Sequence, residues 1–292
     1  MKLARTVQAK WVVRSKWVGG GESSFPSKKR VVMSNRRSNT RSVACAGTAS
    51  ALKSRVLLAG NVNVSLSAAG VSTINGDAKA NNIEVFVDGF EITVTEAGGG
   101  TINGEDSEVI YFTADVLNIN ISSAGGSDKV MIDSMTGTAG NLMINLGAGS
   151  DSLRILNSTI GGKLKVTGGA GSDKVGVEGS QMLDNVTVEL GAGQDSIRVW
   201  NSTFSGTTFV DTGKGAQGEI VYIRDSFFVD NVGLKTNGGK DKITSINNTF
   251  ESNLLINGGR GKDTLSIDDL TTVAGVLQIK KIEKIIRLVT PV

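Results

Sequence analysis

Apolar and polar residues alternate in short runs along most of this chain, and the runs recur at a nearly fixed distance. Two and four places after a recurring acidic residue stand aliphatic side chains, with one exception at Ser245. Such alternation predicts a strand with one buried face. An apolar pair nine and seven places before most of the acids, as in Leu142 and Ile144, predicts a second inward-facing strand. The first-strand pairs are Val130/Ile132, Leu153/Ile155, Val175/Val177, Ile197/Val199, Val221/Ile223, Ile243/Ser245 and Leu265/Ile267.

The recurring acid sets the period of the chain. Successive acids lie 23, 22, 22, 24, 22 and 22 residues apart, and Gly-Ala-Gly-Ser-Asp ends at two of them. A constant period of this size is typical of a solenoid, whereas a propeller needs about 40–45 residues per repeat. Each unit reads strand, corner, strand and Gly-rich turn, which fits one coil of a parallel β-helix that buries its apolar side chains by stacking. The acids are Asp128, Asp151, Asp173, Asp195, Glu219, Asp241 and Asp263.

The sequence therefore predicts an all-β fold, a single-stranded right-handed parallel β-helix of about 22 residues per coil. The right-handed sense follows from the preference of parallel crossovers. We expect irregular N-terminal β-repeats over 56–125 and about seven regular coils over 126–275. Residues 276–292 break the pattern and are expected to form strands that cap the core, with lysines protecting the edge.

Two further columns of the repeat have an expected place. Nine residues after the acid stand bulky apolar side chains that should stack inside the solenoid. Asn or Asp recurs at the corner, where these residues tolerate left-handed backbone angles. We expect the corner side chains to form a ladder from coil to coil. The apolar column is Ile160, Met182, Phe204, Phe228 and Phe250, and the corner residues are Asn157, Asn201, Asp225 and Asn247.

Charge is distributed unevenly along the chain. Residues 1–55 carry 13 Lys and Arg against one acid, a net charge of +12, whereas 56–292 carry 18 against 27, a net charge of −9. The folded part is therefore not predicted to bind nucleic acid. The chain has no His and one Cys, so it lacks the commonest general base and any internal disulfide. No run approaches the roughly 20 apolar residues of a membrane span.

The stretch 52–62, Leu-Lys-Ser-Arg-Val-Leu-Leu-Ala-Gly-Asn-Val, joins the basic leader to the repeats. It resembles the Leu-x-x-Arg-x-Leu-Leu-Ala-Gly-x-Val junction of many secreted Gly/Asp-rich β-repeat proteins of planctomycete-type bacteria. Lys53 stands where those proteins usually have Glu. The resemblance implies an extracytoplasmic protein and identifies no enzyme. The leader 1–55 is then an export signal segment, the alternatives being a disordered tail or a start codon placed too early.

The Gly-x-Gly-x-Asp turn is the first candidate for chemistry. It resembles the RTX-type calcium repeat, although the spacing here is 22 residues rather than nine. The resemblance makes four acids of the regular coils candidate calcium ligands. Calcium takes six to eight oxygens, so several coils would have to contribute. The alternative is that each Asp accepts hydrogen bonds from turn amides, and no cofactor is then required. The four acids are Asp128, Asp151, Asp173 and Asp195.

The outward positions of the first strand hold the second candidate. Trp200 and Arg224 should be neighbours in one column and close enough for a cation–π contact. Arg198 and Tyr222 should lie beside them, and Arg154 shares their face. This group predicts a surface that binds anionic polysaccharide or components of the cell envelope. The alternative is an ordinary exposed sheet face.

The function predicted from these features is that of an exported, non-catalytic β-helix, a structural or adhesive module at the cell surface or outside the cell. The alternatives are a polysaccharide-active β-helix, either lyase or hydrolase, and a calcium-stabilised binding repeat protein. Asp133 and Glu178 share a face with the arginines, but they are two coils apart, and no long insertion walls a cleft. We therefore predict no catalytic residue.

Overall fold

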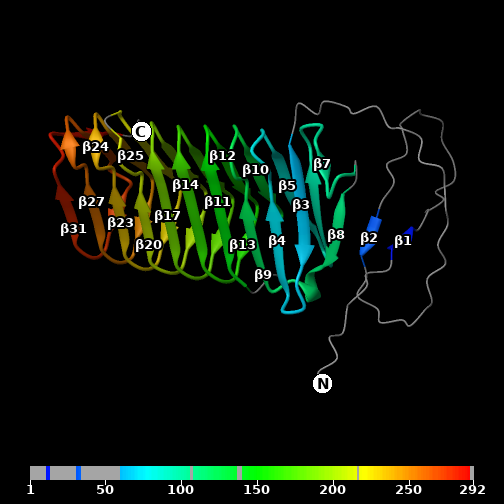
Figure 1. Cartoon of the computed structure of the whole chain (residues 1–292). Coiled ribbons are helices and arrows are strands. Elements are labelled where there is room, and N and C mark those ends of the chain that lie inside the picture. Colours follow the sequence, from blue (N-terminus) through cyan, green and yellow to red (C-terminus); the bar gives the residue numbers. More distant parts are fainter. Residues whose placement is uncertain are drawn as a thin grey trace, which may run out of the picture.

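The computed structural model describes residues 11–13, 31–33, 60–105, 108–136, 140–215 and 217–289. The chain is a parallel β-solenoid of about eight turns with about 22 residues each, which confirms the fold class expected from the period. Figure 1 shows the coils side by side along one axis, from β3 near one end to β31 at the other. The calcium candidates and the aromatic and arginine group lie within the described coils. Most of the leader 1–55 lies outside the described residues.

Three sheets form the faces of the solenoid. Sheet 1 contains, in order, β1 (Trp11–Val13), β2 (Val31–Met33), β8 (Val109–Phe112), β6 (Glu91–Glu96), β5 (Asn82–Asp88), β10 (Lys129–Asp133), β12 (Ser152–Leu156), β15 (Lys174–Glu178), β18 (Ser196–Trp200), β21 (Ile220–Arg224), β25 (Lys242–Ile246), β29 (Thr264–Asp268) and β32 (Lys284–Leu288). Sheet 2 contains β31 (Leu277–Lys280), β27 (Leu254–Asn257), β23 (Val232–Lys235), β20 (Thr208–Asp211), β17 (Val186–Ala192), β14 (Leu164–Ala170), β11 (Leu142–Ala148), β9 (Asn118–Ser122), β4 (Val71–Asn75), β3 (Asn61–Leu66) and β7 (Thr101–Ile102).

Sheet 3 is narrow and follows the corner. It contains β13 (Thr159–Ile160), β16 (Gln181–Met182), β19 (Thr203–Phe204), β22 (Phe227–Phe228), β26 (Thr249–Phe250) and β30 (Thr272–Val273). A separate pair, β24 (Gly238–Gly239) and β28 (Arg260–Gly261), lies in the Gly-rich turns, and a 3₁₀-helix spans Thr113–Asp115.

The register of the strands reproduces the columns of the sequence. Leu153 of β12 lies between Val130 of β10 and Val175 of β15, with all three side chains buried. In the apolar column, the rings of Phe204 and Phe228 stack with centroids 4.7 Å apart, and those of Phe228 and Phe250 lie 4.8 Å apart. The predicted inward strands and the aromatic stack are therefore confirmed.

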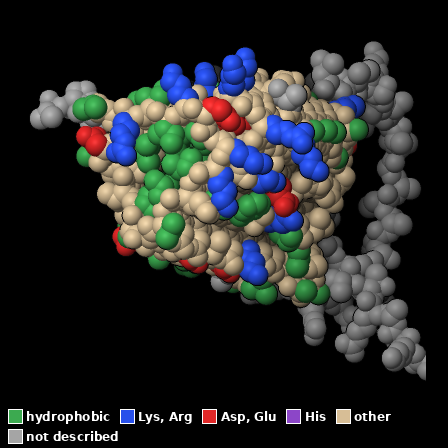
Figure 2. All heavy atoms as spheres, turned by 90° about the vertical axis from the view of Figure 1, so that its left-hand side faces the viewer, with side chains coloured by type: hydrophobic (Ala, Val, Ile, Leu, Met, Phe, Trp, Pro, Cys, Tyr) green, Lys and Arg blue, Asp and Glu red, His purple; other side chains and the backbone are tan. Residues whose placement is uncertain are grey.

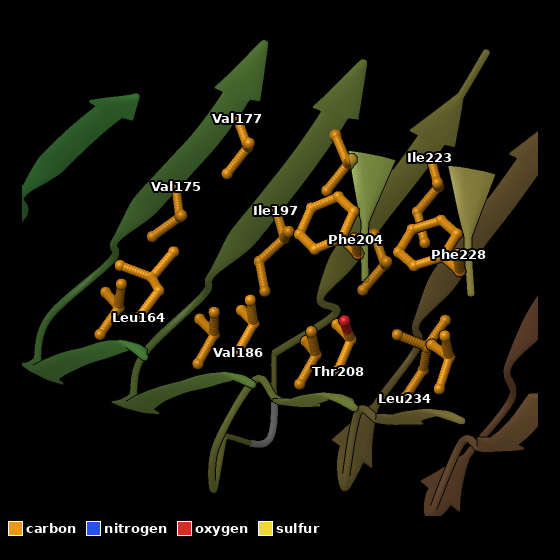
Figure 3. A pocket seen from close by; sticks show the side chains of 16 residues that line it. Leu164, Val175, Val177, Val186, Ile197, Phe204, Thr208, Ile223, Phe228 and Leu234 are labelled. Atoms are coloured by element: carbon orange, nitrogen blue, oxygen red, sulfur yellow. The ribbon is translucent and has the colours of Figure 1, made fainter. Parts of the chain in front are cut away.

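The interior is closely filled. Figure 3 shows labelled side chains such as Leu164, Ile197 and Phe228 pointing into the space between the sheets. The cavity that they line has a volume of about 20 Å³, and Thr208 is the polar member of an otherwise apolar lining. A ligand pocket needs several hundred Å³. This internal cavity is therefore too small to hold a ligand.

The corner next to sheet 3 holds a polar column that we call the serine ladder: Ser158, Ser180, Ser202 and Ser226. Each of these hydroxyls is buried and accepts a hydrogen bond from a backbone N–H of the preceding coil, as in Ser180 N–H to Ser202 Oγ at 3.2 Å. The Asn or Asp before each of Ser158, Ser202 and Ser226 has φ between 48° and 50°, so the predicted left-handed corner is confirmed there. The corner Asn and Asp side chains do not form the continuous ladder that we expected: Asn247 donates to Asp225 and Asn157 to Asp133, and the continuous ladder runs through the serines.

The two ends of the solenoid differ from the regular coils. Near the N-terminal end, β5 and β6 form an antiparallel hairpin through Gly89 and Phe90, and β3 pairs antiparallel with β4, so this part contains hairpins as well as coils. At the other end, β31 and β32 pair in parallel with β27 and β29 and continue the coil. Figure 2 looks onto this last coil and shows apolar side chains surrounded by Lys and Arg.

Candidate functional site

The outer side of sheet 1 carries a cation on each of six consecutive strands, and we call this surface the cationic face. All six side chains are exposed. Because neighbouring strands are about 4.8 Å apart, the cations follow the solenoid axis at about that interval. Arg154 and Arg198 lie in one column, and the lysines in another, directly after the repeating acid. The six are Lys129 of β10, Arg154 of β12, Lys174 of β15, Arg198 of β18, Arg224 of β21 and Lys242 of β25.

Two cation–aromatic pairs lie at the centre of the cationic face. The guanidinium carbon of Arg198 lies 5.7 Å from the ring centroid of Tyr222, and that of Arg224 lies 6.0 Å from the ring of Trp200. In each pair the two residues are direct neighbours in the parallel register of β18 and β21. The contacts expected from the repeat are therefore confirmed. The Trp200 side chain remains 43% exposed, so part of its ring is available to a ligand.

Asp225 holds the Trp200–Arg224 pair in place. Its Oδ2 accepts hydrogen bonds from the Trp200 indole N–H at 3.2 Å and from Arg224 Nε at 2.9 Å. Its Oδ1 accepts one from the Asn247 amide at 2.7 Å. The Asn247 bond, with smaller contributions from Trp200 and Arg224, lowers the pKa of Asp225. Sequence reasoning assigned Asp225 only to the corner and missed this role, because its side chain reaches across from the next strand.

A gap separates Arg154 from Arg198 on the cationic face. Gly176 lies between them in the column and has no side chain, and a Cβ there would meet its nearest heavy atom at 3.9 Å. The backbones of Arg154 and Arg198 are thus two rungs apart, about 10 Å, with no side chain on the strand between them. Arg154 also lies 3.6 Å from Glu178, both side chains being about half exposed. Surface pairs of this kind contribute little to stability and leave the cation accessible.

Sequence reasoning named the three arginines but missed Lys129, Lys174 and Lys242. The signal was present, because each of these lysines directly follows a repeating acid in the sequence. That position points outward when the acid points inward, since neighbouring residues of a strand face opposite sides. The net negative charge of 56–292 also gave no indication of a cationic surface, because it counts buried and exposed acids together. Seven of those acids are the repeating ones, and their side chains are buried inside the solenoid.

The calcium candidates Asp128, Asp151, Asp173 and Asp195 lie in one buried column. The backbone N–H of Asp128 donates to Asp151 Oδ1 at 2.7 Å, that of Asp151 to Asp173 Oδ1 at 2.9 Å, and that of Asp173 to Asp195 Oδ1 at 2.8 Å. The acids thus accept from amides, as the alternative interpretation expected, but the amides belong to the preceding coil. Within the described ranges the acids stand in a line rather than around a common point. Calcium binding stays a prediction.

Asp133 and Glu178, the acids considered for catalysis, lie on the outer side of β10 and β15. The register places Leu156 of β12 between them, as expected for residues two coils apart. The Ser134 hydroxyl and the Asn157 amide donate to Asp133, at 3.2 and 3.4 Å. This arrangement brings no pair of carboxyl groups together across a cleft.

Comparison with protein-family models, curated proteins and solved structures finds no match for this chain. Among the described residues, no helix is long and apolar enough to cross a membrane.

Proposed function

We propose that this protein is an exported, non-catalytic β-helix that binds anionic polysaccharide through its cationic face. It would act as a structural or adhesive module at the cell surface or outside the cell. The observation that carries the proposal is the row of six exposed cations on a rigid sheet, with the accessible ring of Trp200 among them.

The chemistry of the face suits a repeating acidic polymer. A guanidinium group binds a carboxylate or sulfate through two parallel hydrogen bonds, and an indole ring offers a flat apolar surface for a sugar ring. A polymer lying along the solenoid axis would meet a cation at every rung. Each contact alone is weak in water, but linked contacts reinforce one another because later ones form at high effective concentration. The stacked strands hold the backbones that carry the cations at fixed positions.

The test compares polygalacturonate with a neutral glucan of similar length by calorimetry. We expect the wild-type protein to bind the acidic polymer with an affinity that falls as the salt concentration rises. It should not bind the neutral polymer. Trp200→Ala should weaken binding roughly tenfold, because it removes the central aromatic contact. Phe209→Ala is the matched control, since Phe209 is similarly exposed on the outer side of sheet 2. If Trp200→Ala bound polygalacturonate as well as the wild type, the proposed binding site on the cationic face would be wrong.

The same polymers separate the proposal from the enzymatic alternative. A lyase would generate new unsaturated ends and a hydrolase new reducing ends, whereas a binding module leaves chain length unchanged. The calcium-stabilised alternative predicts a melting temperature that falls with chelator and recovers with calcium. Export itself is tested by identifying the mature amino terminus in the secreted fraction.

A further inference from the structure

The repeating acids form one continuous column inside the solenoid, which we call the acid ladder: Asp128, Asp151, Asp173, Asp195, Glu219, Asp241 and Asp263. Each member after Asp128 accepts a hydrogen bond from the backbone N–H of the preceding member. At the start, the N–H of Asn81 donates to Asp128 Oδ1 at 2.7 Å, and at the end the N–H of Asp263 donates to Glu283 Oε2 at 2.7 Å. All seven side chains are at least 98% buried.

The second oxygen of every acid in the ladder has no hydrogen-bond partner and no exposure to water. These atoms are Oδ2 of the six Asp and Oε1 of Glu219. A buried, ionised oxygen without a donor is costly, and neighbouring acids of equal charge one rung apart add repulsion. The ionised ladder would repeat this arrangement in seven consecutive coils. The geometry therefore fits the ionised form poorly.

Asn81 shows that a hydrogen-bond donor fits at the place of the second acid oxygen. It occupies the same column one coil before Asp128, because Asn82 is in register with Lys129. Its Nδ2 lies within hydrogen-bond distance of four oxygens: the carbonyls of Lys79 at 2.7 Å, Asp77 at 3.1 Å and Ser123 at 3.2 Å, and Asp128 Oδ1 at 3.2 Å. A Cβ built at Gly76, five residues earlier, would lie 2.7 Å from Nδ2 and 2.8 Å from the Ser123 oxygen. A donor and a carbonyl from the next coil thus face each other across that small space.

Asp173 and Asp263 repeat this arrangement with an oxygen in place of the donor. A Cβ built at Gly168, five residues before Asp173, would lie 2.5 Å from Asp173 Oδ2 and 2.4 Å from the Leu190 carbonyl oxygen. At Gly258, five residues before Asp263, the distances are 2.6 Å to Asp263 Oδ2 and 2.3 Å to the carbonyl oxygen of Lys281. At Asp173 and Asp263, the unpartnered oxygen and a carbonyl oxygen of the next coil thus lie on either side of the same small space, and a carbonyl can only accept a hydrogen bond.

We propose that the second oxygen of each acid in the ladder is a hydroxyl that donates to the backbone of the next coil, as Nδ2 of Asn81 does. In mild acid the ladder is then a column of neutral carboxylic acids. The solenoid takes up protons here in mild acid and becomes more stable as it does so.

The electrostatics of the buried column agree with this geometry. Burial raises the pKa of Asp128 and Asp173 to about 6 and the pKa of Glu219 to about 7. It also raises the pKa values of Asp151, Asp195 and Asp241. The charged groups that act on these acids are the neighbouring acids of the ladder. The hydroxyls of Ser123 and Thr236 lie beside Asp128 and Asp241, but they donate to the carbonyl oxygens of Leu146 and Gly258. Lys129, Lys174 and Lys242 follow ladder acids but point into solvent.

The sign of the pH effect follows from the raised pKa values. The six ladder acids from Asp128 to Asp241 bind protons more tightly in the folded protein than in the unfolded chain, whose Asp and Glu titrate near 4. Their contribution to stability is complete below about pH 4 and is lost as the pH rises through 6 and 7. Carboxylates with a lowered pKa, such as Asp211 and Asp225, act in the opposite direction below about pH 4. Between pH 5 and 8, the acid ladder therefore determines how the free energy of unfolding changes with pH.

The experiment compares the full-length wild-type protein with Asp173→Asn, whose amide places a permanent donor at the position of Oδ2. We expect the wild-type melting temperature to fall between pH 5 and pH 8. Asp173→Asn should match the wild type at pH 5 and melt higher at pH 8, by about 2–4 °C per kcal/mol gained. Glu189→Gln, which changes an exposed acid on β17, is the matched control and should change neither value. A variant less stable than the wild type at both pH values would overturn the proposal.

Asp195→Asn repeats the test one coil further along, and failure of both variants to fold would also overturn the proposal, because it would show that a donor is not tolerated. The infrared band of protonated carboxyl groups at pH 5 should lose amplitude in each variant. Calcium and chelator are added in parallel, and neither should shift the melting temperature. A calcium-dependent rise that Asp173→Asn abolishes would overturn the proposal in favour of a cation in the ladder. None of these measurements depends on glycan binding.

Discussion

Two polar columns run through the solenoid, the serine ladder and the acid ladder. They differ in how many of their hydrogen-bonding atoms have a partner. In the serine ladder, each hydroxyl accepts from the preceding coil and also donates to the carbonyl two residues before it. The donor distances are 2.6 Å from Ser158 to Leu156, 2.8 Å from Ser180 to Glu178 and 2.8 Å from Ser202 to Trp200. In the acid ladder, only the accepting half is satisfied.

The difference lies in the chemistry of the side chains. A hydroxyl contains both a donor and an acceptor, so it can join two backbone groups at any pH. A carboxylate only accepts, and it gains a donor when it binds a proton. The serine ladder should therefore be indifferent to pH, whereas the acid ladder should respond to it. Both depend on backbones that stack closely at the neighbouring turns.

The largest effect should come from breaking that stacking. Gly169 has φ of +115°, and a Cβ there would lie 1.8 Å from the carbonyl oxygen of Gly147 in the preceding coil. We expect Gly169→Ala to lower the free energy of unfolding by more than about 3 kcal/mol, measured by chemical denaturation.

Gly89→Ala separates backbone strain from the clash. Gly89 also has positive φ, of +59°, but a side chain there would meet nothing within 4 Å. Its replacement should cost only about 1 kcal/mol. If both variants lost the same free energy of unfolding, the effect of Gly169→Ala would come from backbone strain and not from the close stacking of the turns.

The next effect should come from the serine ladder. Ser202→Ala removes the acceptor of the buried N–H of Ser180 and should cost about 1–3 kcal/mol. We expect the same loss at pH 5 and at pH 8. Ser196→Ala, on the outer side of β18, is the control and should stay within about 0.5 kcal/mol of the wild type. A loss in Ser202→Ala that varies with pH would contradict the distinction between the two ladders.

The smallest effect on stability is expected outside, on the cationic face. Arg154→Ala removes the exposed contact with Glu178 and should change the free energy of unfolding by less than about 0.5 kcal/mol. Its affinity for polygalacturonate should nevertheless fall, because one rung then lacks its cation. Stability and binding are measured on the same preparation. A variant that binds as well as the wild type would show that this end of the face is not used.

Much of this structure could be predicted because the repeat translates sequence spacing directly into register. Residues 22 to 24 apart become neighbours, so the stacking of Phe204 on Phe228 and of Trp200 beside Arg224 followed from counting. The direction of each side chain followed from alternation. Alternation also places the residue after each repeating acid on the outside, so the exposed lysines of the cationic face could have been predicted in the same way.

Other features could not be read from spacing. The sequence shows an Asp at a Gly-rich turn, but not that its oxygen reaches the amide of another coil rather than its own. That choice depends on the three-dimensional path of the turn. The hairpin through Gly89 and Phe90 was also hidden, because hairpin strands and coil strands have the same alternating pattern. The partly satisfied state of the acids appears only when every contact of the side chain is known.

Glu219 shows how the solenoid accommodates a change in chain length. The coil that ends there is two residues longer than most of its neighbours, and at this rung the ladder contains Glu instead of Asp. The longer side chain still reaches the backbone N–H of Asp195 and accepts its hydrogen bond. One extra methylene group thus preserves the column across an insertion. A repeat protein with this device can vary its loops during evolution, and a designer could place a foreign loop in the same coil without shifting the coils that follow.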